Sequence, residues 1–226
     1  MSNYGDFCLS SVQDFVNSNS DIQGVILMKL FSLLLVSLFA VSAFGKTMLD
    51  TSKSQVMWKG TKVFKSDMHA GTINVKSGFV TMEGMMIKGG EIVIDMNSMV
   101  TTDKMSEKAK GNLIAHLKND DFFATDKHPE AKFTIKSVAK KGKAQVVKGE
   151  LMIRGKKGMV EVPMMVKKDG STMMASGTMK FDRTKFDVKY NSKSLFPNLV
   201  KSAKDKVIDD MIEIKLSLVA PAMAKK

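Results

Sequence analysis

Cysteine and arginine are scarce in this chain. Among 226 residues there is one cysteine, Cys8, and there are two arginines, Arg154 and Arg183. A single thiol excludes an internal disulfide, so the folded part of the chain must be stabilised by a hydrophobic core. Because arginine is the side chain that most often reads base edges, its scarcity argues against sequence-specific nucleic-acid binding.

Histidine is also rare, which limits the chemistry available to the chain. His69, His116 and His128 are the three histidines, and they show neither an HxxxH nor an HExxH spacing. The most polar segment, HLKNDDFFATDKHPEAKFTI at 116–135, is interpreted as a structural corner, because His116 is expected to pack on a helix and Pro129 to direct the chain into a strand. We therefore predict no catalytic residue, no metal site and no cofactor, and we expect the protein not to be an enzyme.

The longest apolar run is too short for a transmembrane helix. MKLFSLLLVSLFAVSAFGK, residues 28–46, has a lysine near its start, Lys29, then an apolar core and a small-residue cleavage pattern at 41–45. A bilayer span needs about 20 apolar residues, so the run predicts a signal peptide over 28–45, cleaved near 43–45. Residues 1–27 are acidic and are interpreted as a disordered leader, or as a misplaced start before Met28. The folded domain is then 46–226, located in the periplasm or secreted.

Positive charge is in excess but is dispersed. The whole chain carries +12; since residues 1–45 hold one lysine and three aspartates, residues 46–226 carry +14. Lysine pairs such as Lys140-Lys141 and Lys156-Lys157 fall where turns are expected. This dispersion is typical of a solvated surface, and we predict no nucleic-acid partner. Weak attraction to anionic lipid headgroups, and thus peripheral membrane contact, is left open.

Alternation of apolar and polar residues predicts an all-β domain. It is clearest in GGEIVIDMNSMV (89–100) and MIEIKLSLVA (211–220), and weaker copies occur at 54–63, 72–80, 131–138, 144–153, 159–166 and 172–181. Glycine-containing turns separate most of these segments, which favours about eight strands joined as antiparallel hairpins. Closing such a sheet pairs every edge, so we expect an eight-stranded antiparallel β-barrel.

One segment, 101–123, breaks the alternation. Its apolar residues recur at every fourth position, at Met105, Ala109, Leu113 and Leu117. This period predicts one short amphipathic helix inserted between two strands. Thr102 or Asp103 is expected to cap the start of the helix.

The inward-facing positions of the expected barrel are apolar. A barrel of eight strands is either filled by its own side chains or holds one slender ligand. Few polar groups converge in it, which suits an apolar guest better than a sugar or a nucleotide. The alternative, that these side chains pack only against one another, is left open.

Methionine is unusually abundant, with 20 residues in all. Thioether sulfur is a soft ligand, so a Met-rich exported copper-binding protein is one alternative function. Most methionines, including Met82, Met96, Met164 and Met174, fall within the strand pattern and are interpreted as flexible core residues. A structural or stress-related interaction domain without a ligand is a further alternative.

Six segments occur in the order typical of one known family. They are VMWKGTK (56–62), His69-Ala70-Gly71, EIVIDMNSMVTTD (91–103), HLKNDDFFATDKHPEAKF (116–133), VKGELMIRGKKGMVEVP (147–163) and FDRTKFDVKYNSKSLF (181–196). Between about Leu49 and Val219 the chain therefore resembles the YceI-like family of exported lipid-binding proteins.

The resemblance implies a lipocalin-like barrel with a long apolar cavity for a polyisoprenoid or quinone-like lipid, and no catalytic residues. The side chains that it implies for the cavity lining are Trp58, Ile73, Ile92, Ile94, Phe123, Phe133, Leu151, Ile153, Phe181, Phe186 and Ile214. Lys62, Arg154 and Arg183 are candidates for an anionic headgroup at the rim. The expected function is sequestration or transport of a long-chain apolar lipid, with homodimerisation left open.

We predict that the exported protein begins close to residues 43–45, because signal peptidase cleaves after small residues at the end of the apolar core. N-terminal sequencing of protein isolated from its native host measures this directly. A product that begins well before residue 40 would contradict the prediction.

Overall fold

The computed structural model describes residues 45–63, 67–198 and 206–222. The leader and nearly all of the predicted signal peptide therefore lie outside the described residues. Within this part of the chain the strands are β1 (Lys46–Met48), β2 (Gln55–Thr61), β3 (Met68–Glu83), β4 (Met86–Thr101), β5 (Glu130–Lys141), β6 (Ala144–Ile153), β7 (Lys156–Asp169), β8 (Thr172–Asp182) and β9 (Met211–Pro221).

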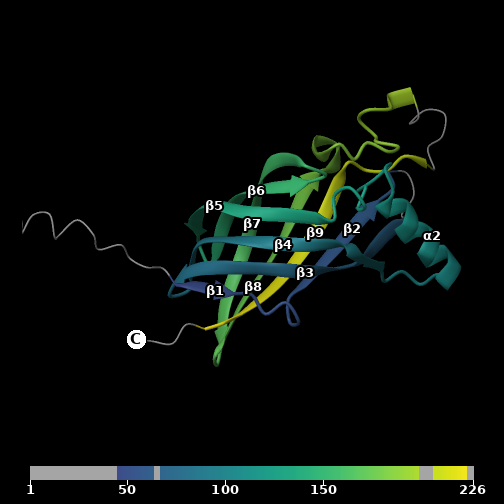
Figure 1. The fold of residues 1–226 in the computed structure, drawn as a ribbon. Coiled ribbons are helices and arrows are strands. Elements are labelled where there is room, and N and C mark those ends of the chain that lie inside the picture. The colour runs from purple at the N-terminus through teal and green to yellow at the C-terminus, as the bar shows by residue number, and fades with distance from the viewer. Residues whose placement is uncertain (1–44, 64–66, 199–205, 223–226) are drawn as a thin grey trace, which may run out of the picture. The chain divides into compact units, whose positions relative to one another are not determined.

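Eight of these strands close into a single antiparallel barrel, as the alternation predicted (Figure 1). From β2 the order around the barrel is β2-β9-β8-β7-β6-β5-β4-β3, and β3 returns to β2. The strands from β3 to β9 pair mainly as successive hairpins, as expected of neighbours joined by short turns. The expected eight-stranded antiparallel barrel with one helix is confirmed.

The closure is made by β2. Its residues pair with β3 from Val56↔Ile73 to Thr61↔Met68, and with β9 from Gln55↔Ser217 to Lys59↔Glu213. The short strand β1 pairs with Phe79–Thr81 near the other end of β3. One edge of β3 is paired with β4. Strand β1 therefore pairs with the same edge of β3 as β2 does, further along that strand, and is not a ninth strand of the barrel. Three residues are too few to show an alternation, so the sequence did not reveal β1.

Helix α2 (Glu107–Lys118) follows β4 and lies at one end of the barrel (Figure 1). Its N-cap is Ser106, whose side chain accepts a hydrogen bond from the Ala109 N–H at 3.3 Å. The expected cap at Thr102 or Asp103 is therefore wrong. The Asp103 carboxylate instead accepts a hydrogen bond from the Ala70 N–H at 3.1 Å and fastens the start of β3. The Asp103 side chain, which the local sequence pattern predicted as a helix cap, is therefore used in a contact with a residue distant in the sequence.

The half of the barrel away from α2 is filled by side chains. Its packed residues are Met82, Ile87, Val147, Val162, Met164, Val166, Met173 and Leu218, around a void of about 50 Å³. The adjacent methionines point to opposite faces, since Met164 is buried while Met165 is 37% exposed. Met174 is 42% exposed, so its expected place in the core is wrong; it alternates with the buried Met173.

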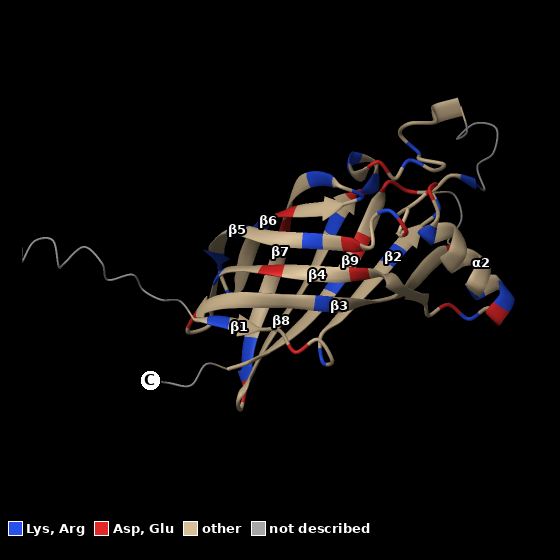
Figure 2. Ribbon diagram, in the orientation of Figure 1, with Lys and Arg blue, Asp and Glu red and all other residues tan. Residues whose placement is uncertain are grey.

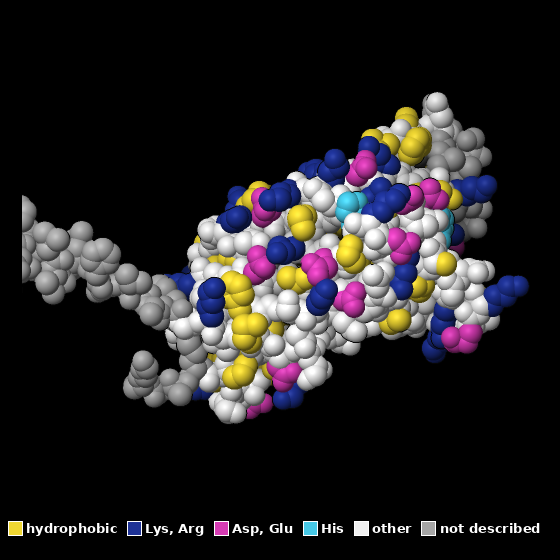
Figure 3. Space-filling view, in the orientation of Figure 1, with side chains coloured by type: hydrophobic (Ala, Val, Ile, Leu, Met, Phe, Trp, Pro, Cys, Tyr) yellow, Lys and Arg dark blue, Asp and Glu magenta, His cyan; other side chains and the backbone are white. Residues whose placement is uncertain are grey.

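Charged side chains are dispersed over the outer face of the barrel, as Figures 2 and 3 show. Several form ion pairs between neighbouring strands, such as Lys132 with Glu91 at 3.2 Å and Lys157 with Glu150 at 3.1 Å. Exposed pairs of this kind contribute at most about 1 kcal/mol each. In the described ranges, no helix has the length and apolar character needed to span a bilayer.

The barrel wall includes a close approach at Gly71. Gly71 is the direct partner of Trp58, and a Cβ atom placed on it would lie 1.9 Å from the Val100 carbonyl oxygen and 2.7 Å from Trp58 Cζ2. Since the first of these atoms belongs to the backbone, no side-chain rotation relieves the clash. Glycine at this position lets the indole ring lie against the strand.

We predict that Gly71→Ala destabilises the protein by about 1–3 kcal/mol or more, because overpacking a strand interior forces backbone shifts. Urea unfolding followed by circular dichroism measures this change.

Gly111→Ala is the matched control, since a Cβ at this position of α2 meets no atom within 4 Å. It should stabilise the protein by up to about 1 kcal/mol through helix propensity. Equal unfolding midpoints for wild type and Gly71→Ala would contradict the close approach.

Candidate ligand-binding cavity

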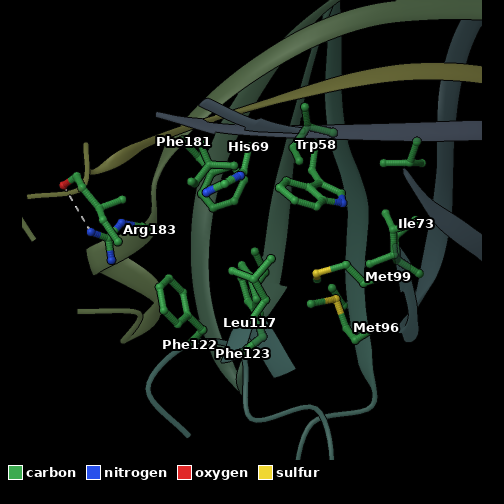
Figure 4. A pocket seen from close by; sticks show the side chains of 18 of the residues that line it. Trp58, His69, Ile73, Met96, Met99, Leu117, Phe122, Phe123, Phe181 and Arg183 are labelled. Carbon is green, nitrogen blue, oxygen red and sulfur yellow. Dashed lines mark hydrogen bonds between the residues drawn. The ribbon is translucent and has the colours of Figure 1, made fainter. Parts of the chain in front are cut away.

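The end of the barrel next to α2 encloses a cavity of about 510 Å³. This volume lies in the usual range of small-molecule sites. Its walls come from β2–β6, β8 and β9, and α2 and the turn that follows it complete the enclosure. Figure 4 shows side chains from these elements converging on the space. The hollow and the filled halves of the barrel meet at Ile92, Phe133 and Leu216, which line both voids.

The side chains that line the cavity are the inward-facing ones, which occur at every second residue along each strand. On β2, Val56, Trp58 and Gly60 face the cavity, and the residues between them face outward. The resemblance implied a long cavity; the void is wide in one half of the barrel and contracts at Phe133 to the small second void. The wide part of the void therefore lies between the α2 end of the barrel and Phe133.

Ten of the eleven side chains expected in the lining border this cavity: Trp58, Ile73, Ile92, Ile94, Phe123, Phe133, Leu151, Ile153, Phe181 and Ile214. Phe186 lies elsewhere. It belongs to the 3₁₀-helix η1 (Arg183–Phe186), is 2% exposed, and packs edge-on against Phe181 with ring centroids 5.4 Å apart. The chain leaves the strand at η1, so the alternation no longer tells which way a side chain points.

Several lining residues were not expected from the sequence. Met96 and Met99 are buried and face the pocket, and Leu113 and Leu117 of α2 border it as well (Figure 4). The four-residue spacing of the two leucines indicated an apolar helix face, which was a usable signal. For Met99 the bulges between β3 and β4 shift the register, so alternation alone could not place it.

Polar groups of the cavity gather at its mouth. His69 Nδ1 lies 2.7 Å from Asp103 Oδ2, and Lys62 Nζ lies 3.5 Å from Asp67 Oδ2. Burial tends to raise the pKa of Asp103, but hydrogen bonds from His69 and the Ala70 N–H outweigh it and hold that pKa below its ordinary value. The carboxylate is therefore charged at neutral pH and remains tied to its donors.

Arg183 is not available as a rim group for a headgroup. It is 1% exposed, and its guanidinium donates to the carbonyl oxygens of Asp209 at 3.1 Å, Val188 at 2.9 Å and Ile208 at 3.3 Å. Burial lowers the pKa of Arg183, while the nearby Asp210 opposes that shift. The expectation of a headgroup contact is therefore replaced by a structural role: Arg183 holds the segments around Val188 and Ile208 at the rim, as the hydrogen bond drawn in Figure 4 illustrates.

Arg154 is likewise committed to the backbone. It donates to the carbonyl oxygens of Asp120, at 3.1 Å, and of Phe122, and so fastens the turn after α2. Of the three basic rim candidates, Lys62 is the one that lies at the mouth with its charge on the surface, at 33% exposure.

The polar segment 116–135 forms a corner in the structure. The His116 ring packs edge-on against Phe122 and Tyr190, with centroids 4.9 and 4.8 Å away. Asp120 pairs with Lys127 at 2.7 Å. No cluster of three or more histidine, cysteine or acidic side chains suited to a metal ion occurs in the part of the chain that the structure describes.

One polar atom of the lining has no partner. Trp58 Nε1 is buried and makes no hydrogen bond within the described residues. In Figure 4 the Trp58 ring lies on the side of the pocket that also holds His69 and Phe181, with Met99 and Met96 below it in the view. The cavity is thus an apolar space with ion pairs at its mouth, and the Trp58 N–H is enclosed in its wall.

Comparison with known proteins identifies the family to which this fold belongs. The YceI-like domain profile matches residues 48–220. A UPF0312 protein of Shewanella denitrificans is 30% identical over 86 residues, which is 38% of this chain and 42% of that protein. The chain spans less than half the length of the curated relatives that it matches.

Two solved structures share the fold. BcnA of Burkholderia cenocepacia has 24% identity and a TM-score of 0.59, with 76% of this chain and 99% of that chain covered. A polyisoprenoid-binding domain from Saccharophagus degradans, implicated in plant cell wall breakdown, has 16% identity and a TM-score of 0.57, with 80% and 99% covered. Because the family profile extends over most of the chain, from β1 to β9, this protein belongs to the YceI-like domain family.

Proposed function

We propose that this protein binds a long-chain apolar lipid, polyisoprenoid or quinone-like, inside the barrel and sequesters or carries it without making or breaking bonds. The observation that supports this most is the cavity of about 510 Å³, walled by aliphatic, aromatic and thioether side chains. The family membership and the similar fold of a polyisoprenoid-binding domain agree with it.

The energetics favour a guest with a long chain. Burying a methylene contributes about 0.8 kcal/mol, while association costs on the order of 4–15 kcal/mol in lost freedom. A guest therefore needs roughly five to twenty buried carbons before binding becomes favourable. Short alcohols or acids do not reach this threshold, whereas a chain of several prenyl units does.

We also propose where the protein acts, from the sequence. The signal peptide predicted for 28–45 supports a role in the periplasm or outside the cell. The excess of lysine on the surface would favour brief contact with anionic membranes, from which a lipid could be taken up. The proposal leaves homodimerisation open and assigns no surface to it.

We predict that protein purified from its native host carries an extractable lipid with a long apolar chain. Organic extraction followed by mass spectrometry should return this lipid at a substantial molar fraction of the protein. Elemental analysis of the same sample tests the copper alternative. A sample that yields only solvent, or one with stoichiometric copper and no lipid, would refute the proposal.

A second prediction concerns the depth of the cavity. Leu151 is buried, faces the cavity and pairs with Phe133, so Leu151→Trp should fill the inner part of the space and weaken lipid binding about tenfold or more. Fluorescent-lipid titration measures the affinity, and circular dichroism checks that the β-structure persists.

The matched control for this change is Met152→Trp. Met152 is the next residue on β6 and points to the outer face, so the same bulk there should leave binding unchanged. Equal affinities for Leu151→Trp and Met152→Trp would show that the inner cavity does not hold the lipid.

A further inference from the structure

The mouth loop, residues 187–198, follows η1 and projects from the same end of the barrel as α2 (Figure 1). It exposes two large apolar side chains, Leu195 at 45% and Phe196 at 47%. The other large apolar side chains that are exposed in the described ranges are eight methionines and one valine, and no two of them are adjacent in the sequence. Apolar residues exposed singly are normal, whereas an exposed pair beside a cavity indicates an interaction site.

Hydrogen bonds to buried side chains hold this pair outward. Ser192 has no exposed surface, and its hydroxyl donates to Asp210 Oδ1 at 2.6 Å. The Ser194 N–H donates to Asp210 Oδ2 at 3.0 Å. The Leu195 N–H donates to Ser192 Oγ at 3.3 Å, and the Phe196 N–H donates to the Ser192 carbonyl oxygen at 3.1 Å. The exposure of the pair is therefore built into a hydrogen-bonded turn.

The mouth loop adjoins the opening of the cavity. An open groove of about 640 Å³ lies between this loop and the turn after α2, and Leu195, Phe196 and Pro197 form its apolar wall. Tyr190 and Asn191 border both this groove and the cavity. The exposed pair is therefore beside the route by which a lipid would reach the barrel interior.

Two basic side chains near the pair have no carboxylate partner. Lys193 precedes Leu195 by two positions and is exposed, and Lys206 is exposed and borders the cavity mouth. Neither forms an ion pair with any residue that the structure describes. The carboxylates of the groove each have a basic neighbour, at 2.7, 3.4 and 2.6 Å: Asp120 with Lys127, Asp121 with His116, and Asp187 with Lys189. The cations left for an outside partner therefore favour one with negative charge.

A bilayer surface fits this loop better than a protein does. A specific protein interface buries about 800 Å² on each partner. An aromatic side chain buries about 150–250 Å², so an exposed pair on a projecting loop is too small to form such an interface. A membrane surface takes up a small apolar insertion and, where its lipids are anionic, also attracts lysines next to it.

We propose that the mouth loop is a membrane-docking surface: Leu195 and Phe196 insert among the headgroups of an anionic bilayer, and Lys193 and Lys206 contact its phosphates. The opening of the cavity then faces the membrane. A lipid passes between bilayer and barrel along the groove, and its apolar chain is not released into water. This use of the surface rests on the proposed function, whereas the docking itself is measured separately.

The first test measures vesicle binding by the exported protein, whose start is checked by N-terminal sequencing. Vesicles of phosphatidylcholine are compared with vesicles of phosphatidylcholine and phosphatidylglycerol in equal parts. Wild type should bind the mixed vesicles more tightly. The double variant Leu195→Ser with Phe196→Ser should bind both kinds about tenfold or more weakly, because the apolar insertion is lost.

The matched control is Met85→Ser with Met165→Ser. These side chains are 49% and 37% exposed and lie toward the end of the barrel away from α2, so their loss should leave vesicle binding unchanged. Circular dichroism checks that each variant is folded. If the two double variants bind vesicles equally well, or if wild type does not bind the mixed vesicles, the inference is wrong.

The second test reverses one charge and does not depend on the fold of the double variant. Lys193→Glu should weaken binding to the mixed vesicles about tenfold at low salt and leave binding to phosphatidylcholine unchanged. The control is Lys140→Glu, the same change at an exposed lysine beside the turn between β5 and β6. Equal losses for the two variants would show that net charge acts without a docking surface, which overturns the inference.

Titration with a fluorescent lipid in detergent solution separates this inference from the proposed function. The mouth-loop variants should keep the wild-type affinity for this probe, since Leu195 and Phe196 do not line the cavity. If wild type binds vesicles through the loop but takes up no probe, the proposed function fails and the docking surface stands. If a wild-type dimer separates in the Leu195→Ser, Phe196→Ser variant, a second copy covers the pair and the inference is wrong.

Discussion

The barrel depends on β2, whose seven residues hydrogen-bond to β3 on one side and to β9 on the other. These pairings join the beginning of the folded chain to its last strand; without them the sheet would have two open edges, which proteins normally protect. Trp58 lies at the centre of this strand and its ring extends into the cavity. The strand that closes the fold is thus also the one that positions the largest side chain of the site, so that folding and binding share one element.

A second constraint is the unequal filling of the interior. Away from α2 the side chains interdigitate around a void of about 50 Å³, whereas near α2 they leave about 510 Å³. Helix α2, all of whose residues are described, contains no fully buried residue, yet its Leu113 and Leu117 border the space. The helix therefore acts as a wall and does not plug the barrel. Apolar atoms along such a wall lack contacts on one side, and a guest chain would restore the dispersion energy that is missing.

Local patterns predicted the strands well because alternation reflects a physical period that tertiary contacts do not change. They failed where a long-range contact decides. Asp103 accepts a hydrogen bond from the Ala70 N–H instead of capping α2. Arg183 is buried and donates to the carbonyl oxygens of Val188, Ile208 and Asp209, the last two of which lie more than 20 positions away in the sequence. Phe186 follows a 3₁₀ turn, after which the strand period no longer applies. The lack of a hydrogen-bond partner for Trp58 Nε1 cannot be predicted from a sequence, because it depends on how the folded chain packs around the ring.

The positive charge of the domain reaches the cavity at four lining residues, Lys62, Lys132, Arg183 and Lys206. Both arginines are held by carbonyl oxygens, and the lysines of the barrel face are paired with carboxylates across strands or lie in solvent. Under the proposed function, selectivity inside the cavity rests on the shape of its apolar walls. Such walls suit chains of different length, since apolar contact is not directional. Interactions of the exterior charges weaken as salt increases, whereas apolar contact inside the barrel does not depend on charge.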